Sequence, residues 1–288
     1  MTGQLDLHVR LASSKDKQKI ANLLHFETYI HRHLDWRNPL DWITHQPYLV
    51  LVSGNDILAA LACPPDPPDI SWIRLFATGS LIPIDEAWEA LWIPALQKLS
   101  SYEVNKVAVI PLHEWFRQLV IHSRFSPSTQ VITLAWSRQA LPPSKVGKEI
   151  TIRAMTLDDI NQITILDTLA FNLIWRNSQS SLEMAFHQAA IATVVEYNGL
   201  LVGYQISTVN QIGGHLARLA IHPKFQGTGI GYALLRDLLL RFERKGANQV
   251  TVNTQEENSI SLGLYEKAGF TFTGEKFQVF EQKLPASE

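Results

Sequence analysis

The segment from Ala220 to Leu235, AIHPKFQGTGIGYALL, decides how the second half of this sequence is interpreted. It places three glycines within five residues, between an apolar run and a helical pattern; they are Gly227, Gly229 and Gly231. Glycine lets a ligand approach the backbone closely because it has no Cβ. The free amides at the start of a helix attract an anion. The segment therefore predicts a loop that binds a phosphate group, and the alternative is a turn that only connects strand to helix.

Two common phosphate-binding loops do not fit this segment. A Walker A loop counted from Gly227 requires a second glycine where Tyr232 stands, and no lysine follows it. A dinucleotide-binding loop, Gly-x-Gly-x-x-Gly, fails at Tyr232 and, one register later, at Leu234. The remaining pattern is Gln-x-x-Gly-x-Gly over residues 226–231, which opens a helix directly. This pattern suits a pyrophosphate that backbone amides hold without a lysine.

The composition is that of a folded protein without a strongly charged surface. The chain has 288 residues, 46% of them hydrophobic and 18% charged, and a net charge of −2. The length favours two domains, and the charge favours neither nucleic acid nor a membrane as a partner. Cys63 is the single cysteine, which excludes an internal disulfide and fits a reducing compartment. There is no apolar signal-peptide core and no run long enough for a membrane helix, so a cytoplasmic location is expected.

The second half alternates strand and helix patterns. The patterns predict strands at 150–155, 213–222, 248–255 and 277–284, a β-hairpin over 192–207, and helices at 156–171, 182–190, 230–246 and 259–269. Thr156 is the expected N-cap of the first of these helices, and Gly246 and Gly269 are the expected stops of the last two. This order predicts an α+β, or mixed α/β, domain around one mixed sheet.

The two halves of the chain resemble each other. The segment VRLASSKDKQKIANL aligns with IRAMTLDDINQITIL at an offset of 143 residues. WIRLFA aligns with LARLAI and places Arg74 over Arg218, at an offset of 144. SRFSPSTQVITL aligns with AGFTFTGEKFQVF and places Phe125 over Phe270, at an offset of 145. Three matches at nearly one offset predict a duplicated domain, with coincidence among apolar strands as the alternative.

The boundary between the halves is predicted at a polar segment. SRQALPPSKVGKEI, residues 137–150, contains two prolines and a glycine and separates two strand-like runs, as a linker does. Domains are therefore expected at residues 1–137 and 148–288, joined by a linker at 138–147.

The segment LARLAIHPKFQGTGIGYALL, residues 216–235, resembles the acetyl-CoA-binding core of the Gcn5-related N-acetyltransferase (GNAT) family, whose signature is Gln/Arg-x-x-Gly-x-Gly/Ala. The family's later segment, Asn…Leu-Tyr-x-x-x-Gly-Phe, has its counterpart in Asn258 and LYEKAGF, residues 264–270. The resemblance covers residues 148–288. It implies two GNAT-like domains, each with a mixed, largely antiparallel central sheet flanked by helices, and an acetyl-CoA site in the second domain.

The resemblance also implies roles for the matching positions. Backbone amides of the glycine loop would bind the pyrophosphate of coenzyme A; they are those of Gln226, Gly227, Thr228, Gly229, Ile230 and Gly231. The preceding strand would hold the pantetheine arm and the thioester carbonyl, through Leu219, Ala220 and Ile221. Asn258 would form a hydrogen bond with the arm, and Tyr265 would donate a proton to the departing thiolate.

The spacing of Asn258 and Tyr265 fits these roles. Seven residues of helix separate them by two turns on one face, about 10 Å along the axis. An unperturbed tyrosine has a pKa of about 10, which suits protonation of a thiolate. The alternatives are an asparagine that caps the helix and a tyrosine that packs in the core.

Two residues are candidates for the general base. Acetylation of an ammonium group requires removal of a proton near neutral pH, by a carboxylate, a histidine or an ordered water. Glu196 and His215 lie on strands that flank the expected site. The alternatives are a surface glutamate and a structural histidine.

The first half lacks the residues that mark this site. At the position of the glycine loop it reads FATGSLIPIDEAWEAL, where Gly79 alone remains and Pro83 interrupts the pattern. The Asn…Tyr segment is replaced by PLHEWFRQLVIHSRF. Residues 1–137 are therefore expected to form a degenerate domain that binds no coenzyme A. The pattern His-x-His-x-Asp over residues 31–35 could bind a metal, but a polar loop is its more common use, and no metal site is expected.

These features predict an enzyme that transfers an acetyl group from acetyl-CoA to a primary amine by direct attack. No activated nucleophile is in view, so no acyl-enzyme is expected. The main alternative is a non-catalytic acyl-CoA-binding sensor or interaction module; transfer of an aminoacyl group from tRNA fits poorly with the near-neutral charge. The segment Phe171–Met184, expected to roof the acceptor site, has Glu183 as its single acid, which disfavours a polycationic acceptor. The sequence does not distinguish a small-molecule from a peptide amine, and it does not indicate the oligomeric state.

Overall fold

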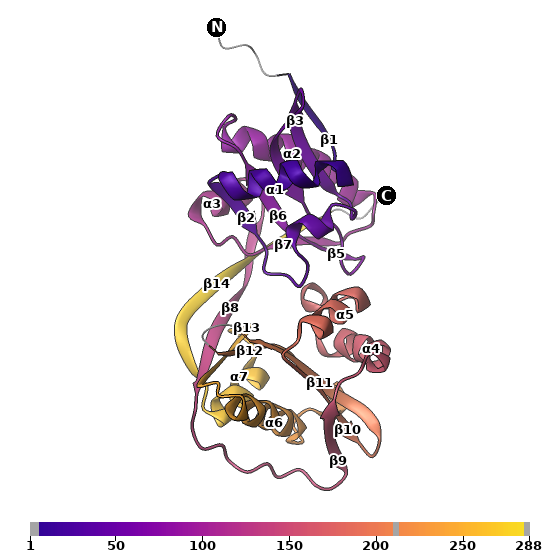
Figure 1. The fold of residues 1–288 in the computed structure, drawn as a ribbon, viewed down its shortest axis with the longest axis vertical. Coiled ribbons are helices and arrows are strands. Elements are labelled where there is room, and N and C mark those ends of the chain that lie inside the picture. Colours follow the sequence, from indigo (N-terminus) through magenta and orange to yellow (C-terminus); the bar gives the residue numbers. More distant parts are fainter. Residues whose placement is uncertain (1–5, 210–212, 285–288) are drawn as a thin grey trace. The chain divides into compact units, whose positions relative to one another are not determined.

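The computed structural model describes residues 6–209 and 213–284, which form two compact units (Figure 1). Unit 1 comprises Met1–Ser128 and Gln278–Glu288, and unit 2 comprises Thr129–Phe277. Within the described ranges, every helix is too short or too polar to cross a membrane. The strands form one five-stranded and one nine-stranded sheet, the second of which begins with β5 (Ile70–Trp72) and β7 (Lys106–Val109), and each unit has its own helices and its own apolar core.

Unit 1 contains a five-stranded antiparallel sheet in the order β1-β3-β4-β6-β2. The strands of this sheet are β1 (Leu7–Leu11), β2 (Tyr29–Arg32), β3 (Tyr48–Ser53), β4 (Asp56–Ala62) and β6 (Leu75–Thr78). A separate short strand, β5 (Ile70–Trp72), pairs in parallel with β7 (Lys106–Val109). The helices are α1 (Lys17–Phe26), α2 (Ile84–Ser100) and α3 (Glu114–His122), with 3-10 helices at Ser14–Asp16 and Pro39–Trp42. Rings from α2, α3 and β6 pack together in its core, namely Trp88, Trp92, Phe116 and Phe76.

Unit 2 is built around strands in the order β14-β8-β13-β12-β11-β10-β9. The strands are β8 (Ser126–Ser137), β9 (Ile150–Ala154), β10 (Ile191–Tyr197), β11 (Leu200–Val209), β12 (Gly214–Ile221), β13 (Gln249–Gln255) and β14 (Thr271–Lys283). Strand β12 pairs in parallel with β13, whereas β9 to β12 pair antiparallel with one another and β13 pairs antiparallel with β8. This arrangement confirms the predicted mixed, largely antiparallel sheet.

Helices cover both faces of this sheet (Figure 1). They are α4 (Ile160–Ala170) and α5 (Gln179–Gln188) on one face and α6 (Ile230–Arg244) and α7 (Ser259–Ala268) on the other, with 3-10 helices at Leu157–Asp159, Leu173–Trp175 and Pro223–Phe225. The apolar side of α6 forms because leucines recur at helical spacing. Leu235, Leu238 and Leu239 pack there against Trp136 of β8 and Val250 of β13.

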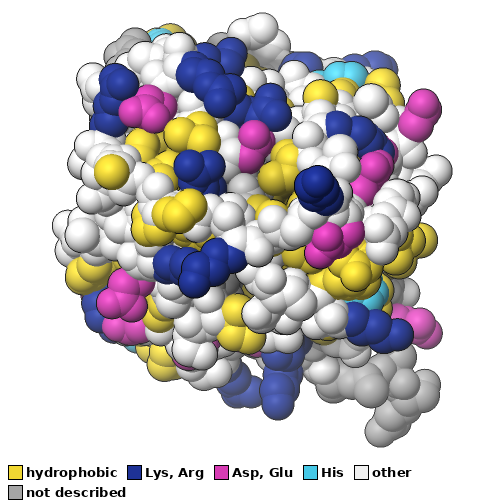
Figure 2. All heavy atoms as spheres, turned by 90° about the horizontal axis from the view of Figure 1, so that it is seen from below, with side chains coloured by type: hydrophobic (Ala, Val, Ile, Leu, Met, Phe, Trp, Pro, Cys, Tyr) yellow, Lys and Arg dark blue, Asp and Glu magenta, His cyan; other side chains and the backbone are white. Residues whose placement is uncertain are grey.

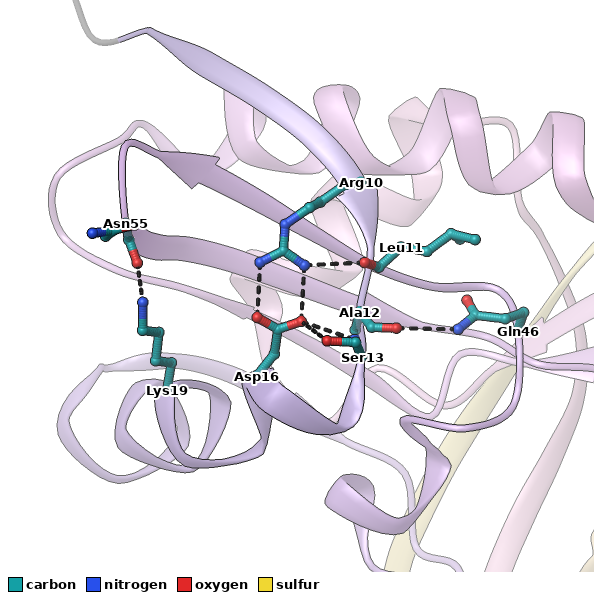
Figure 3. Close-up of polar contacts among 8 residues, drawn as sticks. All are labelled: Arg10, Leu11, Ala12, Ser13, Asp16, Lys19, Gln46 and Asn55. Carbon is teal, nitrogen blue, oxygen red and sulfur yellow. Dashed lines mark hydrogen bonds and ion pairs between the residues drawn. The ribbon is translucent and has the colours of Figure 1, made fainter.

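The same polar motif occurs at the start of each unit, at the offset that the sequence alignment predicts. In unit 1 the guanidinium of Arg10 donates to both carboxylate oxygens of Asp16, at 2.8 and 2.7 Å, and the Ser13 amide donates to the same carboxylate at 2.8 Å (Figure 3). In unit 2, 143 residues later, Arg153 donates to Asp159 at 2.8 and 2.8 Å, and the Thr156 amide donates at 2.8 Å. The same capping box therefore opens the first helix of each half.

The last strand of each half pairs with the other half. The two strands, β8 and β14, each follow a left-handed turn residue, Arg124 with φ 68° and Gly269 with φ 88°, at the predicted offset of 145. Strand β8 then pairs along β13 in unit 2, and the end of β14 pairs with β7 in unit 1. The compact units therefore divide the chain after residues 128 and 277, which differs from the predicted domains at 1–137 and 148–288. Sequence pattern places β8 with the half that precedes it, but its hydrogen bonds place it with unit 2.

The predicted linker, residues 138–147, contains no helix or strand. It lies along α6 rather than projecting from unit 2. The carbonyl of Pro142 accepts hydrogen bonds from the Tyr232 hydroxyl at 2.8 Å and from Arg236 Nε at 3.0 Å. Leu141 packs against the core of unit 2 and Val146 against the cluster beneath the glycine loop.

Candidate functional site

The glycine loop leads directly into α6, as the sequence predicted. Gly227 has φ 76° and Gly229 has φ 90°, and Gly229 is the N-cap of the helix. Both angles lie in the left-handed region that a residue with a Cβ rarely adopts. Gly231 has no such angle, and a Cβ there would make ordinary contacts with Ile221 and Leu264, at 3.5 and 3.7 Å. The backbone therefore requires glycine at the first two positions, and the third glycine leaves space beside the strand.

The loop before α6 is exposed to solvent. The Ala233 amide, which donates to the Gly229 carbonyl at 3.0 Å, makes the first hydrogen bond inside α6. By helix geometry the amides of Ile230, Gly231 and Tyr232 precede the hydrogen-bonded ladder. Residues 226–229 are exposed. The positive end of a 15-residue helix and its first amides are thus presented to solvent.

Strand β12 loses one of its two neighbours partway along its length. Its first residues, Gly214–Leu216, pair with Val250–Val252 of β13. Beyond Leu216 it is paired with β11 alone, while β13 continues along β8 as far as Gln255. A bulge marks this point, because Ala217 is an additional residue between the pairs that join β12 to β11.

The edge that β12 leaves open carries the backbone groups of Leu219 and Ile221. The His222 amide donates to the Val202 carbonyl on β11 at 2.8 Å, and successive residues of a strand face alternate neighbours. Leu219 and Ile221 therefore face away from β11, toward the side where β13 would lie. We call these two positions the open edge of β12. The predicted Ala220 faces β11 instead, so its backbone is part of the ladder.

The open edge leads to the glycine loop. The Gln226 side-chain amide donates to the Ile221 carbonyl at 3.1 Å, which joins the end of β12 to the start of the loop. Ile221, Ile230 and Leu234 pack together beneath it. A row of backbone groups on β12 is therefore continuous with the exposed amides of α6, and this arrangement fits an extended chain that ends in a pyrophosphate.

The two predicted residues of α7 have different surroundings. Asn258 is the N-cap, and its side-chain oxygen accepts from the Ser261 amide at 3.1 Å. Tyr265 is 5% exposed, and its ring packs against Phe270 with centroids 5.4 Å apart. The described residues give its hydroxyl no hydrogen-bond partner. Burial raises the pKa of Tyr265, so its hydroxyl remains protonated at neutral pH.

The two candidate bases lie in different parts of the sheet. His215 is on β12, two residues before the bulge, and its Nδ1 lies 2.9 Å from the Thr251 hydroxyl. Burial lowers the pKa of His215, so the ring is neutral near pH 7 and has a free electron pair. Glu196 is on β10, where Arg153 Nε donates to it at 2.8 Å. Arg153 thus joins the carboxylate of Glu196 to the capping motif of Asp159.

A cavity of about 290 Å³ lies beside the paired part of β12 and β13. Its side chains come mainly from β8, β13 and β14, and they include Thr133, Thr251, Thr273, Gln249 and Glu275. The hydrogen bond between Thr251 and His215 connects this cavity to the start of the bulge. Glu275 is the single ionisable side chain among the lining residues.

The sequence reasoning missed a buried polar cluster around Asp167. This carboxylate, from α4, is 0% exposed and accepts from Arg218 Nε and Nη2 at 2.8 and 2.6 Å and from the Tyr204 hydroxyl. Arg218 also donates to the Trp175 carbonyl at 2.6 Å and lies 3.4 Å from the centre of the Phe171 ring. The cluster therefore fastens the segment after α4 to the middle of β12. Its members are far apart in the chain, so no local pattern indicates them.

The surface charges are mixed. Figure 2 shows lysine and arginine side chains interspersed with acidic and hydrophobic ones over one face. This distribution agrees with the net charge of −2. Among the described residues, no group of three or more histidine, cysteine, aspartate or glutamate side chains is arranged to hold a metal ion.

Comparison with known proteins supports the assignment of this site to a family. Residues 170–281, which include the open edge, the glycine loop and α7, match the family model of the acetyltransferase (GNAT) domain.

Solved structures of similar fold extend over both units. A GCN5-related N-acetyltransferase from Sphaerobacter thermophilus is 14% identical, with a TM-score of 0.61, over 98% of this chain and 97% of that chain. A tandem GNAT protein from the clavulanic acid biosynthesis pathway is 12% identical, with a TM-score of 0.62, over 98% and 100%. A GCN5-related N-acetyltransferase from Anabaena variabilis is 11% identical, with a TM-score of 0.71, over 97% and 73%. At such identities the likeness establishes the fold, and the match to the family model is confined to residues 170–281 in the second half of the chain.

Proposed function

We propose that this protein transfers an acetyl group from acetyl-CoA to a primary amine. The observation that carries the proposal is the continuity between the open edge of β12 and the exposed amides of the glycine loop. Backbone groups of Leu219 and Ile221 would pair with the amide-containing pantetheine arm as a neighbouring strand would. The amides of residues 227–231 would hold the pyrophosphate, because the Gln226 amide already donates to the Pro223 carbonyl at 3.3 Å. Bound there, acetyl-CoA supplies the activated thioester.

The protein groups at the open edge have a defined part in the transfer. A backbone amide that faces the thioester carbonyl stabilises the negative charge that develops on its oxygen when the amine attacks. Cys63, the single cysteine of the sequence, is buried in unit 1 with a raised pKa, so it is not proposed as a nucleophile. Direct attack by the acceptor amine is therefore the proposed route, without an acyl-enzyme.

Two side chains are proposed to move protons. Tyr265 is protonated at neutral pH, as an unperturbed tyrosine also is, and burial raises its pKa further; its hydroxyl therefore has a proton to give to the leaving thiolate. His215 is neutral because burial lowers its pKa, so it can accept a proton from the ammonium form of the acceptor, directly or through water. Glu196 is the weaker candidate for this role because its carboxylate is already bound by Arg153.

The acceptor is proposed to be a small-molecule or peptide amine that enters the cavity beside β12 and β13. The cavity holds a group of a few heavy atoms, offers hydroxyl and amide partners, and has one carboxylate, Glu275, to attract an ammonium. A free cysteine in the core fits the reducing conditions of the cytoplasm, where we place the enzyme.

Calorimetric titration with acetyl-CoA, followed by measurement of coenzyme A release with a panel of amines, tests the proposal. We expect binding that is abolished in Gly229→Trp, whose side chain would fill the loop, and retained in Leu200→Trp, at an exposed position of the β10–β11 hairpin. Binding without release of coenzyme A by any amine would favour the alternative, an acyl-CoA-binding sensor. Absence of binding in the wild type would contradict the proposed function.

A further inference from the structure

Unit 1 contains the same pair of parallel strands that borders the site in unit 2. Ser71 pairs with Val107 in parallel register. Their counterparts 143 residues later, Gly214 and Val250, also pair in parallel. After Trp72 the chain leaves β7 and continues as β6, paired with β4, as β12 continues along β11. This register corrects the sequence alignment by one residue, because it places Arg74 over Ala217, rather than over Arg218.

The backbone of β6 is oriented as that of β12 is. The Gly79 amide donates to the Leu58 carbonyl on β4 at 2.8 Å, and its counterpart at an offset of 143, His222, donates to Val202 at the same distance. Phe76 and Thr78 must therefore face away from β4. They correspond to Leu219 and Ile221, the open edge of β12.

In unit 1 this edge is not open, because β2 occupies it. Strand β2 pairs antiparallel with β6, with Tyr29 opposite Thr78 and His31 opposite Phe76. The ladder continues to the His33 amide, which donates to the Arg74 carbonyl at 3.0 Å. Every second residue along this ladder is hydrogen-bonded to its partner, so β2 pairs with the backbone groups that correspond to those of Leu219 and Ile221.

Strand β2 is held firmly by the core of unit 1. His31 is 1% exposed, its Nε2 lies 3.2 Å from the Ile73 carbonyl, and its ring stacks on Phe116 with centroids 4.2 Å apart. Burial lowers the pKa of His31 to about 3, so the ring is neutral and adds no charge to the core. The ring of Tyr29 packs against Trp115 at 5.5 Å. These contacts make β2 a structural part of unit 1 rather than a loose segment.

The segment of unit 2 that corresponds to β2 follows α4 and is not a strand. After α4 the chain forms the 3-10 helix Leu173–Trp175 instead of a strand, and the Asp167 carboxylate accepts from the Asn177 amide at 2.9 Å. Arg218 binds this carboxylate and the Trp175 carbonyl together. The residue that corresponds to Asp167 in α1 is Leu24, which is apolar and buried. Leu24 cannot form the ion pair that Asp167 forms with Arg218. The segment after α1 is therefore not held in the way that the segment after α4 is held.

We propose that β2 takes, in unit 1, the place that the pantetheine arm of coenzyme A takes in unit 2, so that the chain binds one acetyl-CoA. The identity of the ligand rests on the function proposed above for unit 2. The occupied edge of β6 is a separate feature, carried by the pairing of β2. Unit 1 is then a coenzyme A domain whose binding edge is filled by its own chain.

The test combines binding stoichiometry with hydrogen exchange of the full-length protein. We expect one acetyl-CoA per chain, and none in Gly229→Trp. In the free protein the amides of Phe76 and Thr78 should exchange slowly, whereas those of Leu219 and Ile221 exchange at least tenfold faster and become protected when acetyl-CoA is added. Protection of Phe76 and Thr78 should not change with acetyl-CoA.

Each other outcome has a distinct meaning. Two sites per chain, or one site that persists in Gly229→Trp, would overturn the proposal. Rapid exchange at Phe76 and Thr78, or protection there that rises with acetyl-CoA, would overturn it as well. If the wild type binds no acetyl-CoA, the function proposed for unit 2 fails; slow exchange at Phe76 and Thr78 beside rapid exchange at Leu219 and Ile221 would still support the filled edge of unit 1.

Discussion

Replacement of Tyr265 by phenylalanine tests whether its hydroxyl acts in the transfer or the side chain only packs in the core. The ring contacts with Phe270 would remain, and the described residues give the hydroxyl no hydrogen-bond partner to lose. We therefore expect the free energy of unfolding to change by less than about 0.5 kcal/mol. Loss of a general acid lowers turnover by about 10²–10⁴-fold, which corresponds to a rise of about 3–5 kcal/mol in the barrier. The Kd for acetyl-CoA should stay within about twofold of wild type, since the hydroxyl is proposed to act on the leaving thiolate and not on binding.

The matched control is Tyr204→Phe, another buried tyrosine in unit 2. Its hydroxyl donates to the Asp167 carboxylate, so its removal takes one hydrogen bond from a buried charge. We expect a loss of about 1.5–3 kcal/mol in the free energy of unfolding. Tyr265→Phe should therefore lower turnover with little change in stability, whereas Tyr204→Phe should lower the free energy of unfolding.

Urea unfolding, calorimetry and single-turnover release of coenzyme A measure the three quantities. The reasoning about Tyr265 is refuted if Tyr265→Phe keeps the wild-type rate of acetyl transfer. It is also refuted if the loss of rate is matched by an equal loss of stability, because the hydroxyl would then have a structural partner.

Three further predictions concern the glycine loop, the candidate base His215 and the capping motif of Asp159. Gly229→Ala should lower the free energy of unfolding by about 1 kcal/mol and weaken acetyl-CoA binding, because alanine is strained at φ 90°; unchanged urea midpoint and Kd would contradict this. His215→Ala should lower kcat with little change in the Kd for acetyl-CoA, and in the wild type the acidic limb of kcat should lie below pH 6.5, since burial lowers the pKa of this base; a limb above pH 6.5 would exclude the assignment. Asp159→Asn should destabilise the protein at pH 7, where the ion pair with Arg153 lowers the pKa of Asp159 to about 2. A depressed carboxylate pKa gives stability that is full above the unfolded value of about 4 and is lost toward pH 2, so wild-type and variant unfolding curves should converge there, and a difference that persists below pH 2 would show another cause.

Much of the candidate site follows from residues that are close together in the chain. The start of α6 after the glycine loop and the N-cap at Asn258 are local features, and the sequence pattern predicts both of them. The repeat is also readable, because Arg153 and Asp159 are six residues apart, as are their counterparts in the first half. Such motifs depend on backbone geometry within one or two turns, so the order of residue types is enough to specify them.

Other features depend on contacts between distant segments. Arg218 and Asp167 are 51 residues apart. Strand β8 of the first half pairs with β13 of the second half, and the end of β14 pairs with β7 of the first half. The sequence analysis considered Glu196 as a base, but the fold places Arg153 beside it. Strand β2 lies in a segment whose histidines suggested a polar loop, and its partner β6 comes more than 40 residues later. A strand edge can accept any segment that reaches it in the right register. The amino-acid order therefore predicts that a strand edge exists. Packing of the whole unit decides whether that edge stays open for a ligand or is filled by the protein itself.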